Sequence, residues 1–165
     1  RLGLKTFTTD SHNAPGRFNV FDYRGATVIA DYGHNSDAIE ALVRAVDAMP
    51  SQRRHVVISG AGDRRDADLR HQTEILGDAF DTVTLYQDAC QRGRADGEVL
   101  RLLRDGLASA RRTRTIAEIR GEFAAIDAAL SQLEPGDLCL ILVDQVEEAL
   151  AHLAMRLSEE VAMSA

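Results

Sequence analysis

The sequence predicts an α/β fold with three layers: a mostly parallel sheet of about six strands, an antiparallel hairpin at one edge, and helices on both faces. Strand-like runs alternate with amphipathic helical stretches along the chain, and this alternation is typical of parallel strands joined by right-handed crossovers. The runs at 55–59 (HVVIS) and 138–143 (LCLILV) are continuously apolar, as strands buried on both faces are. A length of 165 residues suits one domain with a continuous core.

The N-terminal part is predicted to be a connector followed by a hairpin. Residues 1–17 show no apolar period and contain several turn-forming residues, so we expect them to lead into the domain. Phe18–Tyr23 and Ala26–Ala30 are strand-like and flank Arg24-Gly25, which is a short hairpin signal.

The remaining elements follow in alternation. Further strands are expected at His55–Ser59, Thr82–Tyr86, Thr113–Ile116 and Leu138–Val143. Helices are expected at 36–49, 66–80, 97–109, 121–133 and 145–157, where apolar residues recur at spacings of three and four. The polar tail at 158–165 is expected to fray.

Composition excludes several classes of function. The formal net charge of −7 argues against a nucleic-acid partner, because phosphate contacts require a basic face. No run approaches the ~18 apolar residues of a membrane span, so no membrane partner is expected. Cys90 and Cys139 lack the spacing of a zinc site or a disulfide framework, and no metal site is predicted from them. We expect a cytoplasmic protein.

Three polar clusters follow predicted strands at their carboxyl ends, where ligands bind in open α/β sheets. The first cluster is DYGHNS at 31–36. Asn35 or Ser36 can cap the next helix, which would direct free backbone N–H groups toward a ligand. Asp31 can hydrogen-bond a ribose hydroxyl, and His34 can contact a phosphate. A capped helix with a solvent-facing histidine is the alternative interpretation of this cluster.

The second cluster is GAGDRRD at 60–66. Its two glycines allow a tight turn or a close approach to a ligand. The segment is neither a Walker loop nor a dinucleotide fingerprint, because no lysine follows the glycines and Arg65 stands at the place of the third glycine. Arg64 and Arg65 offer forked donors for a carboxylate or a phosphate. A solvated charged turn is an equally weighted alternative.

The third cluster, DACQRGR at 88–94, is predicted to be a loop that presents Arg92 or Arg94 to a carboxylate, although a plain surface loop explains it as well. Asp144 forms a weaker fourth position that helix capping explains. No nucleophile–base pair, esterase elbow or H-E-x-x-H pattern is present. The residues therefore favour a binding domain over a self-sufficient enzyme.

The ordered set of motifs resembles the C-terminal domain of the Mur ligase superfamily, whose members join amino acids to carboxylates through an acyl-phosphate made with ATP. The resemblance is carried by PGRF (15–18), ATVIADYGHN (26–35) and GAGDRRD (60–66). The runs LYQDACQRGRADGE (85–98) and LVDQVEEAL (142–150) resemble more specifically the cyanophycin synthetases, which add aspartate and then arginine to a growing polymer.

The resemblance implies a Rossmann-like domain over 18–157 and assigns roles to individual residues. Asp31 would lie at the ribose of ATP and His34 near its phosphates, while Arg92 is a candidate for the α-carboxylate of the incoming amino acid. The implied nucleotide-binding residues are Arg17, Asp31, His34 and Asn35, and the implied substrate-binding residues are Asp63, Arg64, Asp88 and Arg92.

Two departures and one gap qualify what the resemblance implies. Ser36 replaces a proline common in the family, and the D-N-P-R signature of diaminopimelate-adding relatives is absent. The pattern G-x-x-x-x-G-K-[ST] is also absent from this sequence. The family keeps its phosphate loop and magnesium ligands in a central ATPase domain, so ATP and Mg²⁺ would be held mainly there, with residues 1–17 as the connector.

By this reasoning the isolated domain cannot catalyse the reaction, and its expected partners are the central domain of the same polypeptide and an amino-acid substrate. The most specific expectation is the addition of arginine to an aspartate side-chain carboxylate. A stand-alone nucleotide-binding or regulatory module without ligase activity is the alternative.

Overall fold

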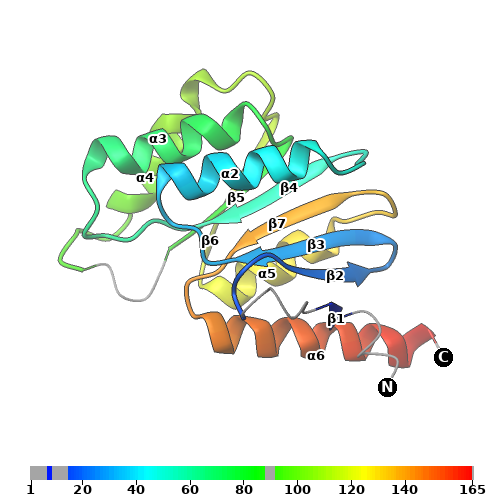
Figure 1. Ribbon diagram of the computed structural model, residues 1–165. Helices are drawn as coiled ribbons and strands as arrows, with labels where there is room; N and C mark the ends of the chain where they lie inside the picture. The colour runs from blue at the N-terminus through cyan, green and yellow to red at the C-terminus, as the bar shows by residue number, and fades with distance from the viewer. Residues whose placement is uncertain (1–6, 9–14, 88–91, 165) are drawn as a thin grey trace.

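The computed structural model describes residues 7–8, 15–87 and 92–164 (Figure 1). The strands are β1 (Phe7–Thr8), β2 (Asn19–Tyr23), β3 (Ala26–Asp31), β4 (Arg54–Ile58), β5 (Thr82–Gln87), β6 (Thr115–Arg120) and β7 (Leu138–Leu142). The helices are α2 (Ser36–Asp47), α3 (Asp66–Gly77), α4 (Glu98–Gly106), α5 (Glu122–Ser131) and α6 (Val146–Ser164), with a 3₁₀ turn at Leu107–Ser109.

The sheet has the order β1-β2-β3-β7-β4-β5-β6. The pairs β1/β2 and β2/β3 are antiparallel, and every other neighbouring pair is parallel. The predicted mostly parallel sheet with an antiparallel edge hairpin is therefore confirmed. The sheet is one strand wider than expected, because Phe7–Thr8, inside the predicted connector, pairs with the backbone of Val20 and Phe21 in β2.

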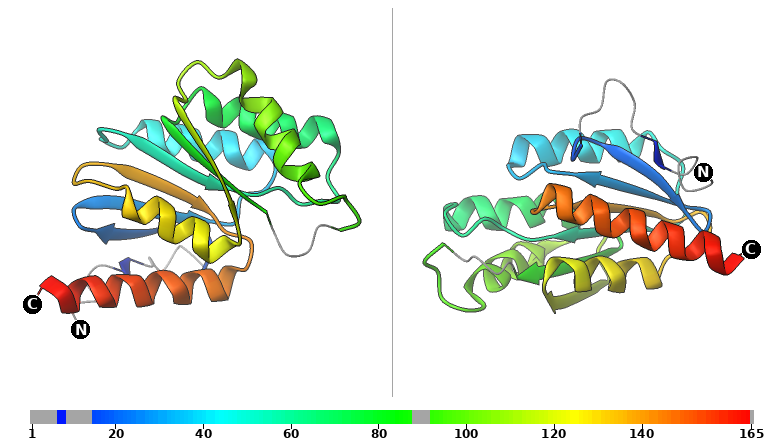
Figure 2. Two further views of the ribbon diagram at one scale, coloured as in Figure 1. Left: turned by 180° about the vertical axis from the view of Figure 1, so that it is seen from behind. Right: turned by 90° about the horizontal axis from the view of Figure 1, so that it is seen from below.

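Helices cover both faces of the sheet, as predicted (Figures 1 and 2). On one face, α2, α3 and α4 pack through side chains such as Ile39, Leu69 and Leu103. On the other face, α5 and α6 contribute Ile126 and Leu153 among others. Both core clusters are built mainly of Leu, Ile, Val and Ala, so most of the stabilising free energy of burial comes from aliphatic surface.

Two predicted boundaries were wrong. The strand expected at Thr113–Ile116 runs from Thr115 to Arg120, since this edge strand is half exposed and carries too few apolar residues to mark its position. The helix expected to end at residue 157 continues to Ser164, so residues 158–164 form its last turns and not a frayed tail. No glycine or proline lies between Val146 and Ser164 to end the helix earlier.

Cys139 lies in β7 and is fully buried, which raises the pKa of its thiol to about 12. A thiol held protonated in the core is unreactive. Cys90 lies outside the described residues. Within the described part of the chain, no helix has both the length and the apolar character needed to cross a membrane.

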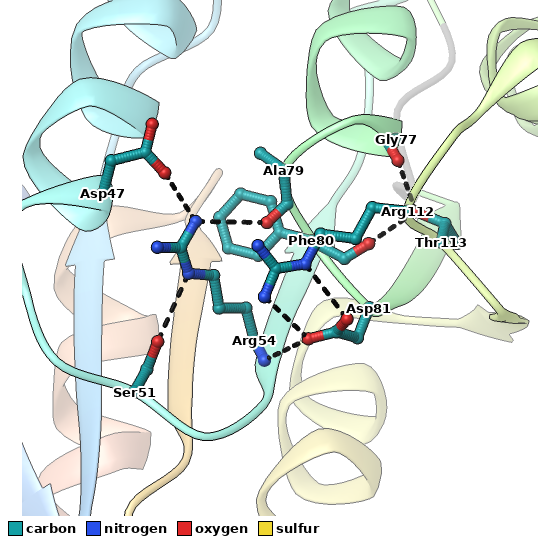
Figure 3. Close-up of polar contacts among 9 residues, drawn as sticks. All are labelled: Asp47, Ser51, Arg54, Gly77, Ala79, Phe80, Asp81, Arg112 and Thr113. Atoms are coloured by element: carbon teal, nitrogen blue, oxygen red, sulfur yellow. Dashed lines mark hydrogen bonds and ion pairs between the residues drawn. The ribbon is translucent and has the colours of Figure 1, made fainter.

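An ionic network ties together the chain segments that enter the sheet at its amino edge (Figure 3). Arg112 donates to both carboxylate oxygens of Asp81 at 3.0 and 3.2 Å, and the backbone N–H of Arg54 donates to the same group at 2.8 Å. The Arg54 guanidinium reaches Asp47 at 2.6 Å and Ser51 at 3.3 Å. Burial raises the pKa of Asp81, but the Arg112 and Arg54 hydrogen bonds outweigh it and bring that pKa below 3.8.

A buried histidine at the same edge predicts acid-sensitive stability. His55 is 3% exposed, its Nε2 atom lies 3.4 Å from Asp137, and neither ring nitrogen has a hydrogen-bond partner among the described residues. Burial lowers the pKa of His55 below 6.5, against the opposing influence of Asp137 and Asp81. The fold therefore favours the neutral ring, and this contribution is complete above about pH 6.5 and is lost as the pH falls below that value.

We expect the melting temperature of the 165-residue chain to fall between pH 7 and pH 5, and His55→Leu to flatten that fall. His71→Gln serves as the control, because His71 is exposed on α3. Thermal denaturation, followed by circular dichroism at a series of pH values above 4.5, measures the melting temperatures of the unchanged chain and of the two variants. An unchanged slope in His55→Leu would assign the pH dependence to other groups.

Candidate functional site

The carboxyl edge of the sheet is hollowed by a pocket of about 490 Å³, formed where β3, β7, β4 and β5 end side by side. Ligands of open α/β sheets bind at this edge. The pocket is lined by Tyr32, Gly33, His34, Ser59, Gly60, Ala61, Asp63, Arg64, Arg65, Asp68, Tyr86, Arg92, Leu142, Val143 and Asp144. Four of the residues predicted for the site, His34, Asp63, Arg64 and Arg92, therefore converge on one hollow.

Asp31 ends β3 and fastens the segment before the hairpin to this edge. Its carboxylate accepts hydrogen bonds from the backbone N–H groups of Phe18 at 2.8 Å and Gly33 at 2.6 Å. The N–H of Tyr32 donates to the Gly16 carbonyl at 2.7 Å. Arg17 is thus held beside the end of β3, and its side chain is exposed. Neither Arg17 nor Asp31 lines the pocket, although Tyr32, which follows Asp31 in the chain, does.

His34 and Asn35 connect β3 to α2. The Nδ1 atom of His34 lies 2.9 Å from the Tyr32 carbonyl, so in the neutral ring Nδ1 carries the proton and Nε2 remains an acceptor. The rings of Tyr32 and His34 lie 4.6 Å apart between centroids. Asn35 caps α2 by accepting from the N–H of Ala38 at 2.8 Å, as expected. Asn35 also lines a smaller adjoining hollow of about 170 Å³, together with Arg64.

The glycine-rich loop 60–65 lies close to two helices. A Cβ atom at Gly60 would lie 2.5 Å from the side chain of Leu69 in α3 and 3.1 Å from that of Val99 in α4, so a larger residue there would require the Leu69 side chain to shift. Arg65 donates to both carboxylate oxygens of Asp68, at 3.0 and 3.1 Å, and the Arg65 hydrogen bond lowers the pKa of Asp68.

Arg64 differs from the other arginines of the pocket. Among residues 15–87 and 92–164, no carboxylate lies within ion-pair distance of its guanidinium, and it lines both hollows. Arg92, in contrast, lies 3.4 Å from Asp63. Its backbone has a φ of 52° and is followed by Gly93 at 87°, which turns the chain back toward α4. Asp88, the remaining predicted substrate residue, lies outside the described residues.

The floor of the pocket contains residues that the sequence did not single out. The Tyr86 hydroxyl, at 1% residue exposure, lies 3.0 Å from the Leu142 carbonyl and 3.4 Å from Glu122. Glu122 is buried and accepts from the N–H groups of Asp144 at 2.6 Å and Gln145 at 3.1 Å. In the sequence, Tyr86 lies in a predicted core strand and Glu122 at the start of a predicted helix. Neither pattern indicated a binding site.

The pocket combines both signs of charge. Arginines 64, 65 and 92 can bind carboxylate or phosphate oxygens, and the aspartates 63, 68 and 144 can accept from amine, guanidinium or hydroxyl groups. Within the described residues, no three histidine, cysteine or acidic side chains gather in a way that would hold a metal ion. The arrangement is suited to binding a zwitterionic or phosphorylated ligand.

Comparison with known proteins extends these observations. The sequence model of the family described as "Mur ligase, glutamate ligase domain" matches residues 16–143. The cyanophycin synthetase of Crocosphaera subtropica is 34% identical over 156 residues, which cover 94% of this chain and 18% of that protein. The chain thus spans less than a fifth of the length of this relative.

Solved structures show the same fold. A UDP-N-acetylmuramoyl-L-alanyl-D-glutamate–2,6-diaminopimelate ligase superposes with a TM-score of 0.73 at 20% identity, covering 90% of this chain and 32% of that one. E. coli FolC in complex with ADP superposes with a TM-score of 0.69 at 23% identity, covering 90% of this chain and 33% of that one. The resemblance noted in the sequence is confirmed, and the chain belongs to the Mur ligase family as a glutamate ligase domain.

Proposed function

We propose that this chain is the C-terminal domain of an ATP-dependent carboxylate–amine ligase. The observation that supports this most directly is the convergence of His34, Asp63, Arg64 and Arg92 on one pocket at the carboxyl edge of a Mur ligase domain. In the reaction, a carboxylate oxygen attacks the γ-phosphorus of ATP and ADP leaves. The amine of the incoming amino acid then attacks the acyl-phosphate carbon, and inorganic phosphate leaves as the amide forms.

The residues of this chain fit the edge of a nucleotide and of an amino acid. Asp31 has lone pairs left beyond its two backbone hydrogen bonds and would accept from a ribose hydroxyl, with Arg17 beside it. As an imidazolium, which bears a hydrogen on both ring nitrogens, His34 would donate to a phosphate oxygen through Nε2 while Nδ1 faces the Tyr32 carbonyl, and the capped N-terminus of α2 at Asn35 adds a positive helix end. Arg64 and Arg92 would hold carboxylate or phosphate groups.

ATP and Mg²⁺ would be held mainly by a central ATPase domain of the same polypeptide, to which residues 1–17 connect. The donors of this chain match ribose and phosphate oxygens, which supports a place at the edge of the nucleotide. Closure of this domain over the central one would exclude water from the acyl-phosphate.

The more specific proposal is that the amine is that of arginine and the carboxylate that of an aspartate side chain, as in cyanophycin synthesis. It is supported by the 34% identity to a cyanophycin synthetase over 94% of the chain. The test is ADP release by the full-length protein with a primer that carries aspartate side chains, in the presence of arginine or of other amino acids. Stimulation by another amino acid alone would contradict the arginine assignment, and stimulation by none would contradict the ligase function.

The isolated 165-residue chain is expected to bind ATP weakly and to hydrolyse none of it. The reason is that its donors cover only the edge of the nucleotide, and phosphoryl transfer requires groups on all phosphates and the metal. Isothermal titration measures the binding, and phosphate release measures the turnover, with the full-length protein as the positive control. Steady turnover by the isolated chain that is abolished in Asp31→Ala or His34→Ala would contradict this prediction.

A further inference from the structure

Arg94 lies outside the pocket, on the side of loop 60–65 that faces α4. Its side chain is 15% exposed, and its guanidinium contacts four groups. The Nε atom donates to the Gly62 carbonyl at 2.8 Å, and Nη2 donates to the Arg64 carbonyl at 2.6 Å. The Nη1 atom reaches Asp66 at 2.8 Å and also Glu98.

These contacts fix the backbone on both sides of one pocket residue. Gly62 and Arg64 flank Asp63, so the two carbonyls that Arg94 binds belong to the residues before and after it. Asp63 and Arg64 both line the pocket. Within the loop, the backbone N–H of Arg64 donates to the Ala61 carbonyl at 3.0 Å.

The chemistry of the contact requires a guanidinium. Two donors in one rigid plane meet two carbonyls 30 and 32 residues away in sequence, a geometry that a lysine ammonium cannot reproduce with a single nitrogen. Hydrogen bonds from a charged donor are about twice as strong as neutral ones. The ion pair with Asp66, whose side chain is 57% exposed, contributes little stability compared with the two hydrogen bonds to the carbonyls.

We propose that Arg94 is a positioning residue, which holds loop 60–65 so that Asp63 and Arg64 present their side chains to the incoming substrate. It acts through backbone carbonyls and does not touch the substrate. The expected effect on substrate binding rests on the proposed ligase function, whereas the effect on the loop does not.

The test compares Arg94→Ala and Arg94→Lys in the full-length protein with Arg104→Ala. Arg104 is a matched control, because it lies on α4, is half exposed and pairs with Glu118 away from the pocket. Hydrogen–deuterium exchange of the peptide covering 60–66 reports the loop, and steady-state kinetics report KM and kcat for the amino acid.

In Arg94→Ala, exchange of the 60–66 peptide is expected to accelerate and KM for the amino acid to rise, each about tenfold, with kcat changed less than about threefold. Arg94→Lys should show both effects more weakly, and it carries the test if the alanine variant does not fold. Arg104→Ala should change neither quantity.

Unchanged exchange at 60–66 in both Arg94 variants would overturn the proposal. So would a fall in kcat as large as the rise in KM, together with faster exchange throughout the domain, since that pattern indicates general destabilisation. If the wild-type protein shows no turnover that depends on an amino acid, the ligase function fails, and the exchange measurement alone still decides whether Arg94 holds the loop.

Discussion

Replacing Gly106 with alanine is expected to lower the free energy of unfolding of the 165-residue chain by about 3 kcal/mol, at the upper end of the usual cost of overpacking. A Cβ atom at this position would lie 2.1 Å from the Arg70 carbonyl oxygen and 2.1 Å from the Thr73 hydroxyl. Both belong to α3, so the backbones of α3 and α4 approach each other directly at Gly106. No side-chain rotation relieves a contact with a backbone atom.

Helix propensity alone would predict the opposite effect, an increase in the free energy of unfolding. Gly106 has helical dihedral angles, with φ −64° and ψ −23°, and alanine in an open helix would be about 1 kcal/mol more favourable than glycine. The clash also displaces Thr73, which is buried and whose hydroxyl lies 2.6 Å from the Leu103 carbonyl. The steric cost and the disturbed hydrogen bond together outweigh the gain in propensity.

Chemical denaturation with urea measures the change, and thermal melting should show a decrease of about 6–12 °C. Gly97→Ala is the matched control, because nothing lies within 4 Å of its Cβ position, while its φ of 81° is left-handed. That strain should cost about 1–2 kcal/mol. A smaller loss for Gly106→Ala than for Gly97→Ala would show that α3 and α4 can separate at little cost.

The central strands could be predicted from the sequence because their signal is strong and local. Both His55–Ser59 and Leu138–Val143 were expected from continuous apolar runs, and the structure places β4 and β7 there, next to each other. The sequence pattern of the strands at the edges of the sheet is weak. The two residues of β1 form a strand only by pairing with β2, and the half-exposed β6 does not carry the apolar pattern of a buried strand.

Part of the candidate site could be predicted for a similar reason. The carboxyl ends of parallel strands lie at one edge, so His34 and Arg64 could be expected to converge without any knowledge of side-chain contacts. Partners within the site could not be predicted in the same way. Arg92 and Arg94 are two residues apart in a loop with the same charge, yet one faces the pocket and the other binds the back of loop 60–65.

In the full-length protein, Arg92→Ala is expected to lower kcat/KM for the incoming amino acid roughly ten- to a hundredfold, and to raise KM for that substrate far more than KM for ATP. The forked guanidinium of Arg92 can hold the α-carboxylate through two hydrogen bonds. Its present partner, Asp63, does not prevent this. Their side chains are 52% and 60% exposed, and an exposed pair at 3.4 Å contributes at most about 1 kcal/mol, so a carboxylate ligand can displace it.

The pair with Asp63 also provides a test of how Arg92 acts. Without Arg92, the carboxylate of Asp63 stands in the pocket unneutralised and would repel an incoming α-carboxylate. If Arg92 only neutralises Asp63, the double variant Arg92→Ala/Asp63→Asn regains the activity of Asp63→Asn. If Arg92 binds the substrate directly, as proposed here, the double variant stays at least about tenfold below Asp63→Asn, the loss of one charge-assisted contact.

Arg101 is the control for this experiment, since its side chain is exposed on α4, and Arg101→Ala should change kcat/KM by less than the equivalent of about 0.5 kcal/mol. Arg94, although it lies two residues from Arg92, would be a poor control because it is proposed to hold the loop that carries Asp63. The variants are compared by steady-state kinetics with the amino acid and ATP varied separately. Equal increases in both KM values, or a loss of kcat/KM in Arg92→Ala no larger than that in Arg101→Ala, would show that Arg92 does not belong to the amino-acid subsite. The candidate for that role would then be Arg64, the pocket arginine that has no carboxylate partner among the described residues.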